Sequence, residues 1–301
     1  MTHTVITDMQ TPTSLLADAA VAALCAEATL SPKPGLVDAR GSGAHTDMDL
    51  DLLLRSAQVL RPTFTDLAAA GLAGGTDLPR LRADLAGVGR VGERTMMAAT
   101  GGVNTHRGAI WALGLTVGAA ASLAPESGAG SAAAILDRVA AIAAHDDPAA
   151  PAPHTPGARA RAHYAVGGAV GAARAGFPAA VAALMSIRGS RLAGATEEQA
   201  RLDGLLAAMT DLDDTCVLVR GGRSALHTVR SGARRALAVG GARTPAGRAV
   251  ITELDRRLCA TGISPGGSAD MLALALLLDE LDTATPPDGR VSDQGRRRRP
   301  T

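Results

Sequence analysis

Aromatic side chains are almost missing from this chain of 301 residues, and their scarcity limits the folds that it can form. Two Phe, one Tyr and one Trp are the only aromatic residues, although 47% of the chain is hydrophobic. A core with so few rings must be packed with Ala, Leu and Val, and Ala and Leu favour helix over strand. The composition therefore predicts an all-α protein in which small residues let helices approach closely.

Apolar residues recur with helical periodicity along most of the sequence, without a convincing alternating strand or a repeat of fixed period. The predicted helices, about ten or eleven in a single bundle, span 12–30, 49–72, 80–99, 105–122, 130–144, 157–175, 178–192, 197–218, 222–239, 245–260 and 267–283. We expect one catalytic domain over 12–284, a flexible N-terminus over 1–11 and a disordered basic tail over 285–301. The Pro-rich segment 146–157 is interpreted as a loop within that domain, because the helices on both sides are equally apolar.

Charge and composition argue against several classes of protein. A net charge of +1 and the lack of rings to stack on bases predict no nucleic-acid partner. The apolar run "YAVGGAVGAARAGFPAAVAALM" is broken by Arg174 and Pro178, and "MTHTVITDMQ" lacks the features of a signal peptide. Cys25, Cys216 and Cys259 are too widely spaced for a metal motif or a disulfide framework. We therefore expect a soluble cytoplasmic protein without a membrane partner.

The single lysine of the chain, Lys33, lies in the segment "SPKPGLVDARGSGAHTDMD". Prolines on both sides limit the backbone freedom of this loop, so the ammonium group can be presented at low entropic cost. That arrangement favours a positioned charge over a solvated one. The same segment ends with Asp47 and Asp49, two carboxylates that could contact a cation, although Asp47 could also be a helix N-cap.

A second polar segment, "ATGGVNTHRGAIWALG", contains a predicted helix start. Asn104 caps the helix, and His106 and Arg107 occupy its first turn. A cation in the first turn opposes the helix dipole, so Arg107 is better explained by a bound phosphate than by helix stability. His106 is either a buried core histidine or a functional group, and its position beside Arg107 favours function.

The third segment, "DLDDTCVLVRGGRS", concentrates carboxylates. Asp211 and Asp214 are predicted to share a helical face at i, i+3, while Asp213 points elsewhere. Adjacent carboxylates repel unless a cation lies between them. Arg220 or Arg223 could be that cation, and so could Mg²⁺, which prefers one or two carboxylates together with phosphate oxygens. A solvated acidic turn is the alternative.

The fourth segment, "SPGGSADMLALALLLD", begins with Ser264 as a predicted N-cap and Pro265 at the first helical position. Gly266 and Gly267 in the first turn each cost about 1 kcal/mol relative to Ala. Close approach of an anionic ligand to the backbone N–H groups would compensate that cost, and a plain glycine-containing cap is the alternative.

Together these segments predict a Mg-nucleotide site built from helix ends. Glycine-bearing turns would bind phosphates, carboxylates would bind the metal, and Lys33, Arg107 and Arg220 would balance the remaining charge. No "GxxxxGK[ST]" motif is present, so a P-loop phosphate cradle is not expected.

The chain is similar to the triphosphoribosyl-dephospho-CoA synthase family, whose members make the prosthetic-group precursor of citrate lyase and malonate decarboxylase. The resemblance runs in order through "PKPGLVD", "GAHTDMD", "GGVNTHRGAIWALG", "LDDTCVLVRGG" and "SPGGSADML", over roughly residues 20 to 280. "NTHRGAIWALG" and "LDDTC" resemble the malonate decarboxylase branch more than the citrate lyase branch. In "GGAVGAARAGFP", Val170 and Ala172 stand where the family commonly has an Arg-Gly-Glu-like run.

This resemblance implies transfer of the 5-triphosphoribosyl group of ATP to the 2'-hydroxyl of 3'-dephospho-CoA, with release of adenine and with Mg²⁺ bound. Such glycosyl transfer passes through an oxocarbenium-like transition state, so the site needs a proton acceptor and a stabilising carboxylate. The catalytic candidates are His106, Asp270 and Asp49; the substrate and phosphate candidates are Lys33, Arg107, Asn104, Arg220, Gly266, Gly267 and Ser268; the metal candidates are Asp213, Asp214 and Asp47. The implied downstream partners are a holo-acyl-carrier-protein synthase and the malonate decarboxylase carrier subunit.

Three alternatives stay open at this point. The first is a synthase of the citrate lyase branch with the same reaction. The second is an all-α Mg-dependent ADP-ribosyl hydrolase-like enzyme, which would share the acidic pairs and use water as acceptor. The third is a nucleotide-binding protein without turnover, which the altered residues Val170 and Ala172 keep open.

Overall fold

The computed structural model describes residues 11–127, 130–150 and 155–283, and these residues form helices joined by loops. The only β pairing in this part of the chain is an isolated bridge between Asp38 and Gly41, so the all-α prediction is confirmed. Helix α1 begins directly after Thr11, whose side chain caps it by accepting a hydrogen bond from the backbone N–H of Ser14. The expectations for residues 1–10 and for the tail 285–301 fall outside the described residues.

The bounds of the helices are α1 Pro12–Thr29, α2 Leu50–Val59, α3 Arg61–Gly74, α4 Leu78–Ala99, α5 Arg107–Ser127, α6 Ala132–Ala143, α7 Pro156–Tyr164, α8 Gly168–Arg174, α9 Pro178–Leu192, α10 Glu197–Asp211, α11 Thr215–Ala238, the 3-10 helix η1 Gly241–Arg243, α12 Pro245–Ala260 and α13 Gly266–Thr283. The longest irregular connection in the described residues is the loop over 30–49, between α1 and α2.

Two predicted helices are each divided in two, which is why the described part contains more helices than expected. The predicted helix 49–72 breaks at Leu60, between α2 and α3. Pro62 is the second residue of α3 and has no N–H to donate, so an unbroken helix could not form there. The predicted helix 157–175 breaks after Tyr164, where Ala165 adopts a left-handed conformation with φ of 54°.

The predicted boundary between helices 197–218 and 222–239 was also misplaced. Helix α10 ends at Asp211 and α11 begins at Thr215, so the true break lies at the acidic residues themselves. The residue at which we expected the next helix to start, Gly222, instead forms a kink inside α11, with φ of 63° and ψ of −161°. That left-handed φ is readily available only to glycine.

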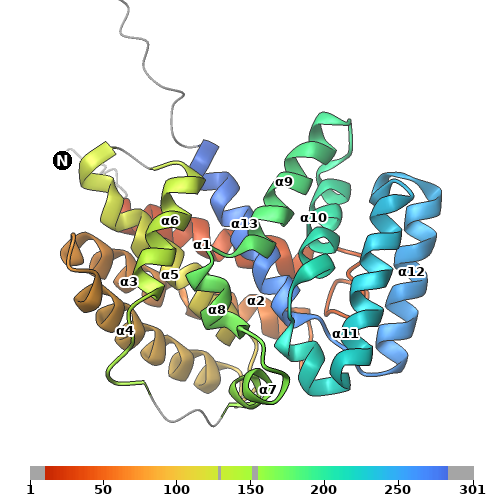
Figure 1. Ribbon diagram of the computed structural model, residues 1–301, viewed down its shortest axis with the longest axis horizontal. Coiled ribbons are helices and arrows are strands. Elements are labelled where there is room, and N and C mark those ends of the chain that lie inside the picture. Colours follow the sequence, from red (N-terminus) through yellow and green to blue (C-terminus); the bar gives the residue numbers. More distant parts are fainter. Residues whose placement is uncertain (1–10, 128–129, 151–154, 284–301) are drawn as a thin grey trace, which may run out of the picture.

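The core is arranged around α13, which is apolar on nearly all sides and is therefore buried on nearly all sides. It packs against α1, α5, α9 and α10, and Figure 1 shows it crossing the middle of the molecule with α3 and α4 at one end and α11 and α12 at the other. Small residues allow the close contacts that the composition predicted. A Cβ added to Gly71 of α3 would lie 2.3 Å from the carbonyl oxygen of Gly118 in α5, so only glycine fits between these two helices.

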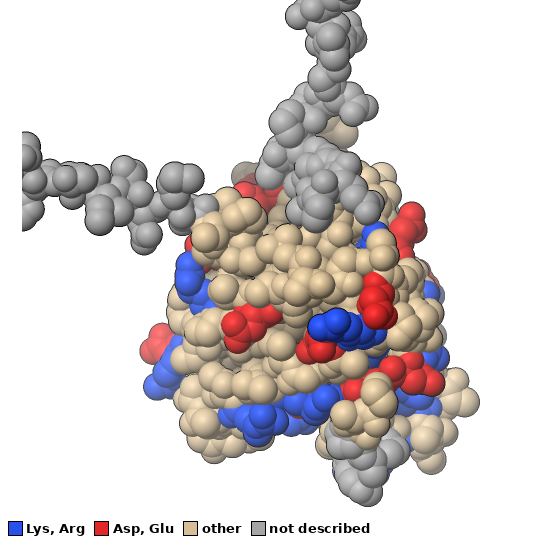
Figure 2. Space-filling view, turned by 90° about the vertical axis from the view of Figure 1, so that its left-hand side faces the viewer, with Lys and Arg blue, Asp and Glu red and all other residues tan. Residues whose placement is uncertain are grey.

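The surface near α3 and α4 carries both signs of charge. Figure 2 shows acidic and basic side chains scattered among uncharged ones on this side, with basic groups gathered towards its lower edge. No single helix in the described residues is long and apolar enough to cross a membrane. The pair α8 and α9 passes that test only jointly, and the two helices are bent by 68° relative to each other.

Candidate active site

One cavity of about 570 Å³ collects the polar segments that the sequence singled out. Its walls come from the loop after α1, the start of α5, the α7–α8 pair, and the starts of α11 and α13. The predicted residues that border it are Lys33, Asp47, Asn104, His106, Arg107, Asp213, Asp214, Arg220, Gly266, Gly267 and Asp270. Asp49 and Ser268 are the two that do not. The cavity therefore brings together groups that are more than 200 residues apart in the sequence.

Lys33 is a positioned charge, but its charge is not available in full to a ligand. Its side chain is 1% exposed, and Nζ lies 2.6 Å from Oε1 of Glu27 and 2.7 Å from the Glu27 carbonyl oxygen. Glu27, near the end of α1, is itself buried. The Lys33–Glu27 pair thus fixes the ammonium group at the cavity wall and balances much of its charge.

His106 is held as a neutral imidazole. Its Nδ1 atom lies 2.8 Å from Oγ of Ser56, and the Nε2 atom is buried without a hydrogen-bond partner among the described residues. Burial, assisted by the nearby charge of Lys33, lowers the pKa of His106 from 6.5 to about 4. In the tautomer in which Nδ1 donates to Ser56, Nε2 keeps a lone pair and can accept a proton or a hydrogen bond.

Asp270, in the second turn of α13, is a partly buried titratable group of the cavity. Burial raises its pKa well above 3.8, and the negative charges of Glu27 and Asp214 raise it further. The carboxyl lies directly against α5: it accepts a hydrogen bond from the backbone N–H of Ala109, and a Cβ on Gly108 would be 2.0 Å from Oδ2. The raised pKa favours the protonated form of this carboxyl.

Asp214 joins the starts of α11 and α13. As the N-cap of α11, it accepts hydrogen bonds at Oδ1 from the N–H groups of Cys216 and Val217. Its Oδ2 atom accepts from the N–H and the hydroxyl of Ser268, at 2.9 Å and 3.1 Å. The predicted helical face shared with Asp211 does not exist, because α10 ends at Asp211 and Asp214 lies outside both helices.

The glycines at the start of α13 have a structural explanation that the sequence did not suggest. A Cβ on Gly267 would lie 3.0 Å from Oδ1 of Asp214, and one on Gly266 would lie 3.3 Å from Sγ of Cys216. Both glycines therefore let the start of α11 approach that of α13. The expected cap is also different, because the hydroxyl of Ser264 hydrogen-bonds to Nε2 of His45 at 2.8 Å.

Asp213 and Asp47 are the predicted metal candidates with exposed oxygens. Oδ1 of Asp213 pairs with Arg230 at 2.9 Å, not with Arg220 or Arg223 as considered, and its side chain is 46% exposed. Oδ1 of Asp47 lies 3.1 Å from Nδ1 of His45. In the described part of the chain, no group of three or more His, Cys, Asp or Glu side chains is placed to hold a metal ion. Asp213, Asp214 and Asp47 thus do not form a ready-made ligand set.

The arginines at the cavity differ in how far they are already paired. Nε of Arg107 lies 3.0 Å from Oε2 of Glu93. This carboxylate offsets the unfavourable interaction between the Arg107 charge and the dipole of α5. Arg220 hydrogen-bonds to the Gly262 carbonyl and to His45 but forms no ion pair in the described residues. Arg161 of α7 also borders the cavity and has no carboxylate within salt-bridge distance in that part of the chain. Arg220 and Arg161 are therefore the best placed for anionic groups of a substrate.

The remaining predicted residues act as helix caps or as buried supports. Asp49 caps α2 by accepting from the N–H of Leu52 at 2.8 Å, and it does not border the cavity, so the structure gives it a structural role rather than a catalytic one. Asn104 caps the start of α5 through the N–H of Arg107, as predicted, and it also borders the cavity. Ser268 is fully buried and binds Asp214 instead of facing the cavity.

Sequence reasoning missed several residues of the cavity wall. Glu27 carried no signal of its own, because an acidic residue near the end of an apolar helix is usually a solvated one. Trp111 and Arg161 lie on helix faces whose direction the sequence alone does not fix. Cys216 is exposed at the cavity wall, and its partial desolvation there together with the charges of Asp214 and Asp270 raises the pKa of its thiol. That thiol is therefore poorly suited to be a nucleophile.

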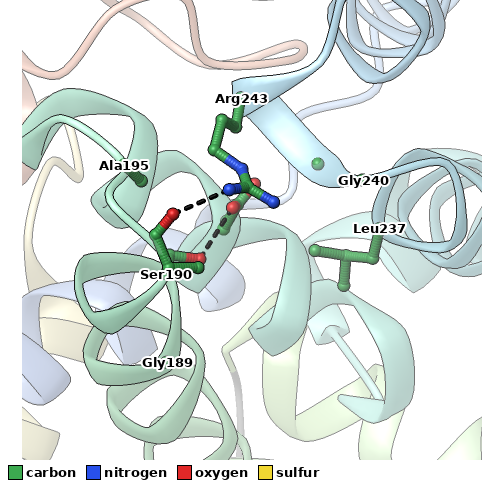
Figure 3. A pocket seen from close by; sticks show the side chains of 9 residues that line it. Gly189, Ser190, Ala195, Leu237, Gly240 and Arg243 are labelled. Atoms are coloured by element: carbon green, nitrogen blue, oxygen red, sulfur yellow. Dashed lines mark hydrogen bonds between the residues drawn. The ribbon is translucent and has the colours of Figure 1, made fainter.

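A second hollow, of about 210 Å³, lies between α9, α10 and η1 and contains none of the predicted residues. Its carboxylate, Asp203, accepts hydrogen bonds from the hydroxyl of Ser190 and from the N–H of Ala242. Arg243 donates to the carbonyl of Ala193 across the same hollow (Figure 3). These polar groups are used to join the helices, so we interpret this hollow as a structural joint.

The larger cavity combines two arginines without an ion pair in the described residues, a neutral imidazole and a carboxyl with a raised pKa, on an all-helical scaffold. Those features define a helical enzyme that binds anionic substrates and transfers protons. The chain belongs to the ATP:dephospho-CoA triphosphoribosyl transferase family, whose model matches residues 13–288.

Relatives agree with the family over nearly the whole chain. The chain is 53% identical over 267 residues to a probable 2-(5''-triphosphoribosyl)-3'-dephosphocoenzyme-A synthase of Pseudomonas aeruginosa (strain UCBPP-PA14), covering 88% of this chain and 90% of the relative. It is 49% identical over 269 residues to the 2-(5''-triphosphoribosyl)-3'-dephosphocoenzyme-A synthase of Klebsiella pneumoniae, covering 89% and 95% of the two chains. No solved structure matches the chain at a significant level.

Proposed function

We propose that this protein is a 2-(5''-triphosphoribosyl)-3'-dephospho-CoA synthase that uses ATP as the donor. The observation that carries the proposal is the convergence of eleven predicted residues on one cavity, in a chain that matches the family over residues 13–288. In the reaction, a bond forms between the 2'-oxygen of 3'-dephospho-CoA and the anomeric carbon of the ATP ribose. The bond from that carbon to adenine breaks, the hydroxyl proton passes to a base, and adenine leaves with a proton. The triphosphate stays intact.

The cavity supplies binding groups without an apparatus for cleaving phosphates. Arg220 and Arg161 are free of carboxylate partners in the described residues and are assigned to the triphosphate or to the phosphates of dephospho-CoA. Arg107 contributes at lower net charge because Glu93 already pairs with it. We assign Lys33 as a substrate donor at the cavity wall. Two of its N–H groups donate to Glu27, and the third can donate to the substrate.

Two groups are suited to move the protons. Nε2 of His106 has no hydrogen-bond partner in the described residues, so we assign it to accept the hydrogen bond or proton of the 2'-hydroxyl. The raised pKa of Asp270 favours its protonated form, so we assign this carboxyl to protonate the departing adenine or, once ionised, to stabilise positive charge on the ribose. His106 as the base and Asp270 as the acid thus lie in different environments of one cavity, which shift their pKa values in opposite directions.

Magnesium remains part of the proposal, and the charges of the cavity support it. The carboxyl groups at its border are Glu27, Asp47, Glu93, Asp213, Asp214 and Asp270, and the cations are Lys33, Arg107, Arg161 and Arg220. A polyanionic substrate meeting more carboxyls than cations needs an additional counter-ion. Asp213 and Asp47 have exposed oxygens and would hold Mg²⁺ together with phosphate oxygens, since Asp214 is already saturated by four donors. When bound, the ion would neutralise phosphate charge.

The malonate decarboxylase branch is the finer part of the proposal. It rests on the motifs "NTHRGAIWALG" and "LDDTC", which supply the Arg107 and Cys216 side chains at the cavity. The downstream partners proposed with it are a holo-acyl-carrier-protein synthase and the malonate decarboxylase carrier subunit, in a cytoplasmic setting. The departure from the family at Val170 and Ala172 lies in α8, at the cavity wall, so it concerns the site directly.

One assay tests the proposal. Purified protein is incubated with ATP and Mg²⁺, with and without 3'-dephospho-CoA, and free adenine and product mass are followed. We expect adenine only when both substrates are present, and none after the Mg²⁺ is chelated. Adenine release without dephospho-CoA would indicate a hydrolase, and no release under any condition would indicate a nucleotide-binding protein without turnover; either result overturns the proposal.

A further inference from the structure

Trp111 is the one aromatic side chain at the cavity that has surface to offer a ligand. Of the four aromatic residues in the chain, only Trp111 and Phe177 border the cavity, and Phe177 is 0% exposed. Trp111 is only partly buried. In a chain with a single tryptophan, its placement at this wall calls for an explanation beyond core packing.

The indole is fixed from two sides. Its Nε1 donates to the carbonyl of Ala169 in α8 at 3.1 Å. The guanidinium of Arg82 lies over the ring, with Cζ 4.9 Å from the ring centroid. Arg82 is 8% exposed, and its Nε and Nη1 have no hydrogen-bond partner in the described residues. A ring held in this way loses little conformational freedom when a flat ligand stacks on it.

The surroundings of Trp111 suit a flat, weakly polar group. The neighbouring wall residues are Gly108 and Ala112 of α5 and Ala169, Val170 and Ala172 of α8, none of which is charged. Arg107 and Gly108 precede Trp111 by one helical turn and so lie on the same side of α5. Gly108 is the residue against which Asp270 packs.

We propose that Trp111 is the stacking platform for the adenine that leaves, the base of ATP. This inference rests on the proposed function and assigns the base to one wall of the same site. The leaving base, and not that of dephospho-CoA, must receive a proton, and Asp270 contacts α5 within one helical turn of Trp111. Arg107 lies on the same side of the helix, towards its start, where it can reach the phosphates of a nucleotide stacked on the indole.

The fluorescence of the wild-type protein provides the first test, because Trp111 is the only tryptophan. Titration with Mg-ATP should change the emission saturably, and adenine should produce a similar change and compete with ATP. Inorganic tripolyphosphate, which has no base, should bind without that change. Equal changes with tripolyphosphate and ATP, or no change with ATP at a concentration that saturates the site by calorimetry, overturn the assignment.

Two variants separate stacking from anchoring of α8. Trp111→Phe keeps a ring and loses the N–H, while Trp111→Leu keeps apolar volume and loses both. If the base stacks on the indole, Trp111→Leu should weaken Mg-ATP binding about 5- to 150-fold by calorimetry. The affinity of Trp111→Phe for Mg-ATP should stay within about 5-fold of that of the wild type. Tripolyphosphate affinity should be the same in all three proteins.

If the N–H bond to Ala169 is what matters, both variants lose ATP and tripolyphosphate affinity together, and the stacking assignment is wrong. The wild-type assay for adenine release is independent of these outcomes. A protein that transfers the triphosphoribosyl group but shows no base-dependent fluorescence change retains the proposed function and loses only this inference.

Discussion

Replacing Glu27 by Gln tests whether the Lys33–Glu27 pair is a buried unit. The two side chains are 1% and 8% exposed and lie 2.6 Å apart, so removing the carboxylate leaves an ammonium group without its counter-charge in a region that water reaches poorly. Breaking one side of such a buried pair costs about 3–5 kcal/mol, whereas exposed pairs are worth about 1 kcal/mol or less. We therefore expect Glu27→Gln to lower the free energy of unfolding by about 3 kcal/mol.

Urea denaturation of matched variants measures this cost. Glu198→Gln, at an exposed position of α10 without an ion pair in the described residues, should change the free energy of unfolding by no more than about 0.5 kcal/mol. Glu27→Leu combined with Lys33→Met removes both charges and should recover most of the stability, because a buried pair and an apolar pair of similar volume are often nearly equal. That double variant should fold but release no adenine.

A loss below about 1 kcal/mol in Glu27→Gln would show that water solvates the pair, and the reasoning on Lys33 would be refuted. The same conclusion follows if the double variant is as unstable as the single one. Adenine release at wild-type rates by the double variant would remove Lys33 from the site while leaving the stability argument intact.

Three further predictions concern the carboxyl, the imidazole and the glycine between helices. Gly108→Ala should abolish adenine release, because its Cβ would lie 2.0 Å from Oδ2 of Asp270. The control Gly87→Ala, whose Cβ would meet nothing within 4 Å, should keep activity and stabilise the fold by up to about 1 kcal/mol. Equal activity of the two variants would contradict the close packing of Asp270 against Gly108. Asp270→Asn should lose turnover, yet it should become more stable than the wild type as the pH rises above about 4, because a carboxyl with a raised pKa in the folded state binds more protons folded than unfolded. Denaturation of both proteins at several pH values checks this. A stability difference that does not change with pH would contradict it. The pKa of His106 is lowered to about 4, so the unfolded state binds more protons than the folded state between pH 6.5 and 4. The free energy of unfolding of the wild type should therefore fall by up to about 3 kcal/mol as the pH drops through that window, and that of His106→Gln should fall less. Parallel pH profiles of the two proteins would mean that the imidazole is not buried as described.

The sequence predicted which segments form the site better than it predicted what each residue does there. Composition was enough for the all-α class, and helix-end chemistry was enough to single out the segments around Lys33, His106, Asp214 and Gly267. These inferences depend on local physics, namely helix propensity, capping and the cost of glycine. Local physics is visible in a single sequence.

The partners across space could not be predicted in that way. Glu27 pairs with Lys33 because the loop after α1 folds back, and Asp214 binds Ser268 because α11 and α13 start side by side. Both contacts depend on how the helices are placed in three dimensions, which periodicity does not encode. For the same reason Asp214, read as a metal ligand, has both carboxylate oxygens hydrogen-bonded, and Gly267, read as a ligand cradle, makes room for Asp214.

Hydrogen–deuterium exchange with and without Mg-ATP tests the central claim that distant helix ends form one nucleotide site. The account predicts that amides in four separate segments, 33–48, 104–108, 213–220 and 264–270, become protected together and at the same ATP concentration. The hollow around Asp203 and Gly240 should show no change and serves as an internal control. Protection confined to one segment, or centred on the Asp203 hollow, would contradict the account.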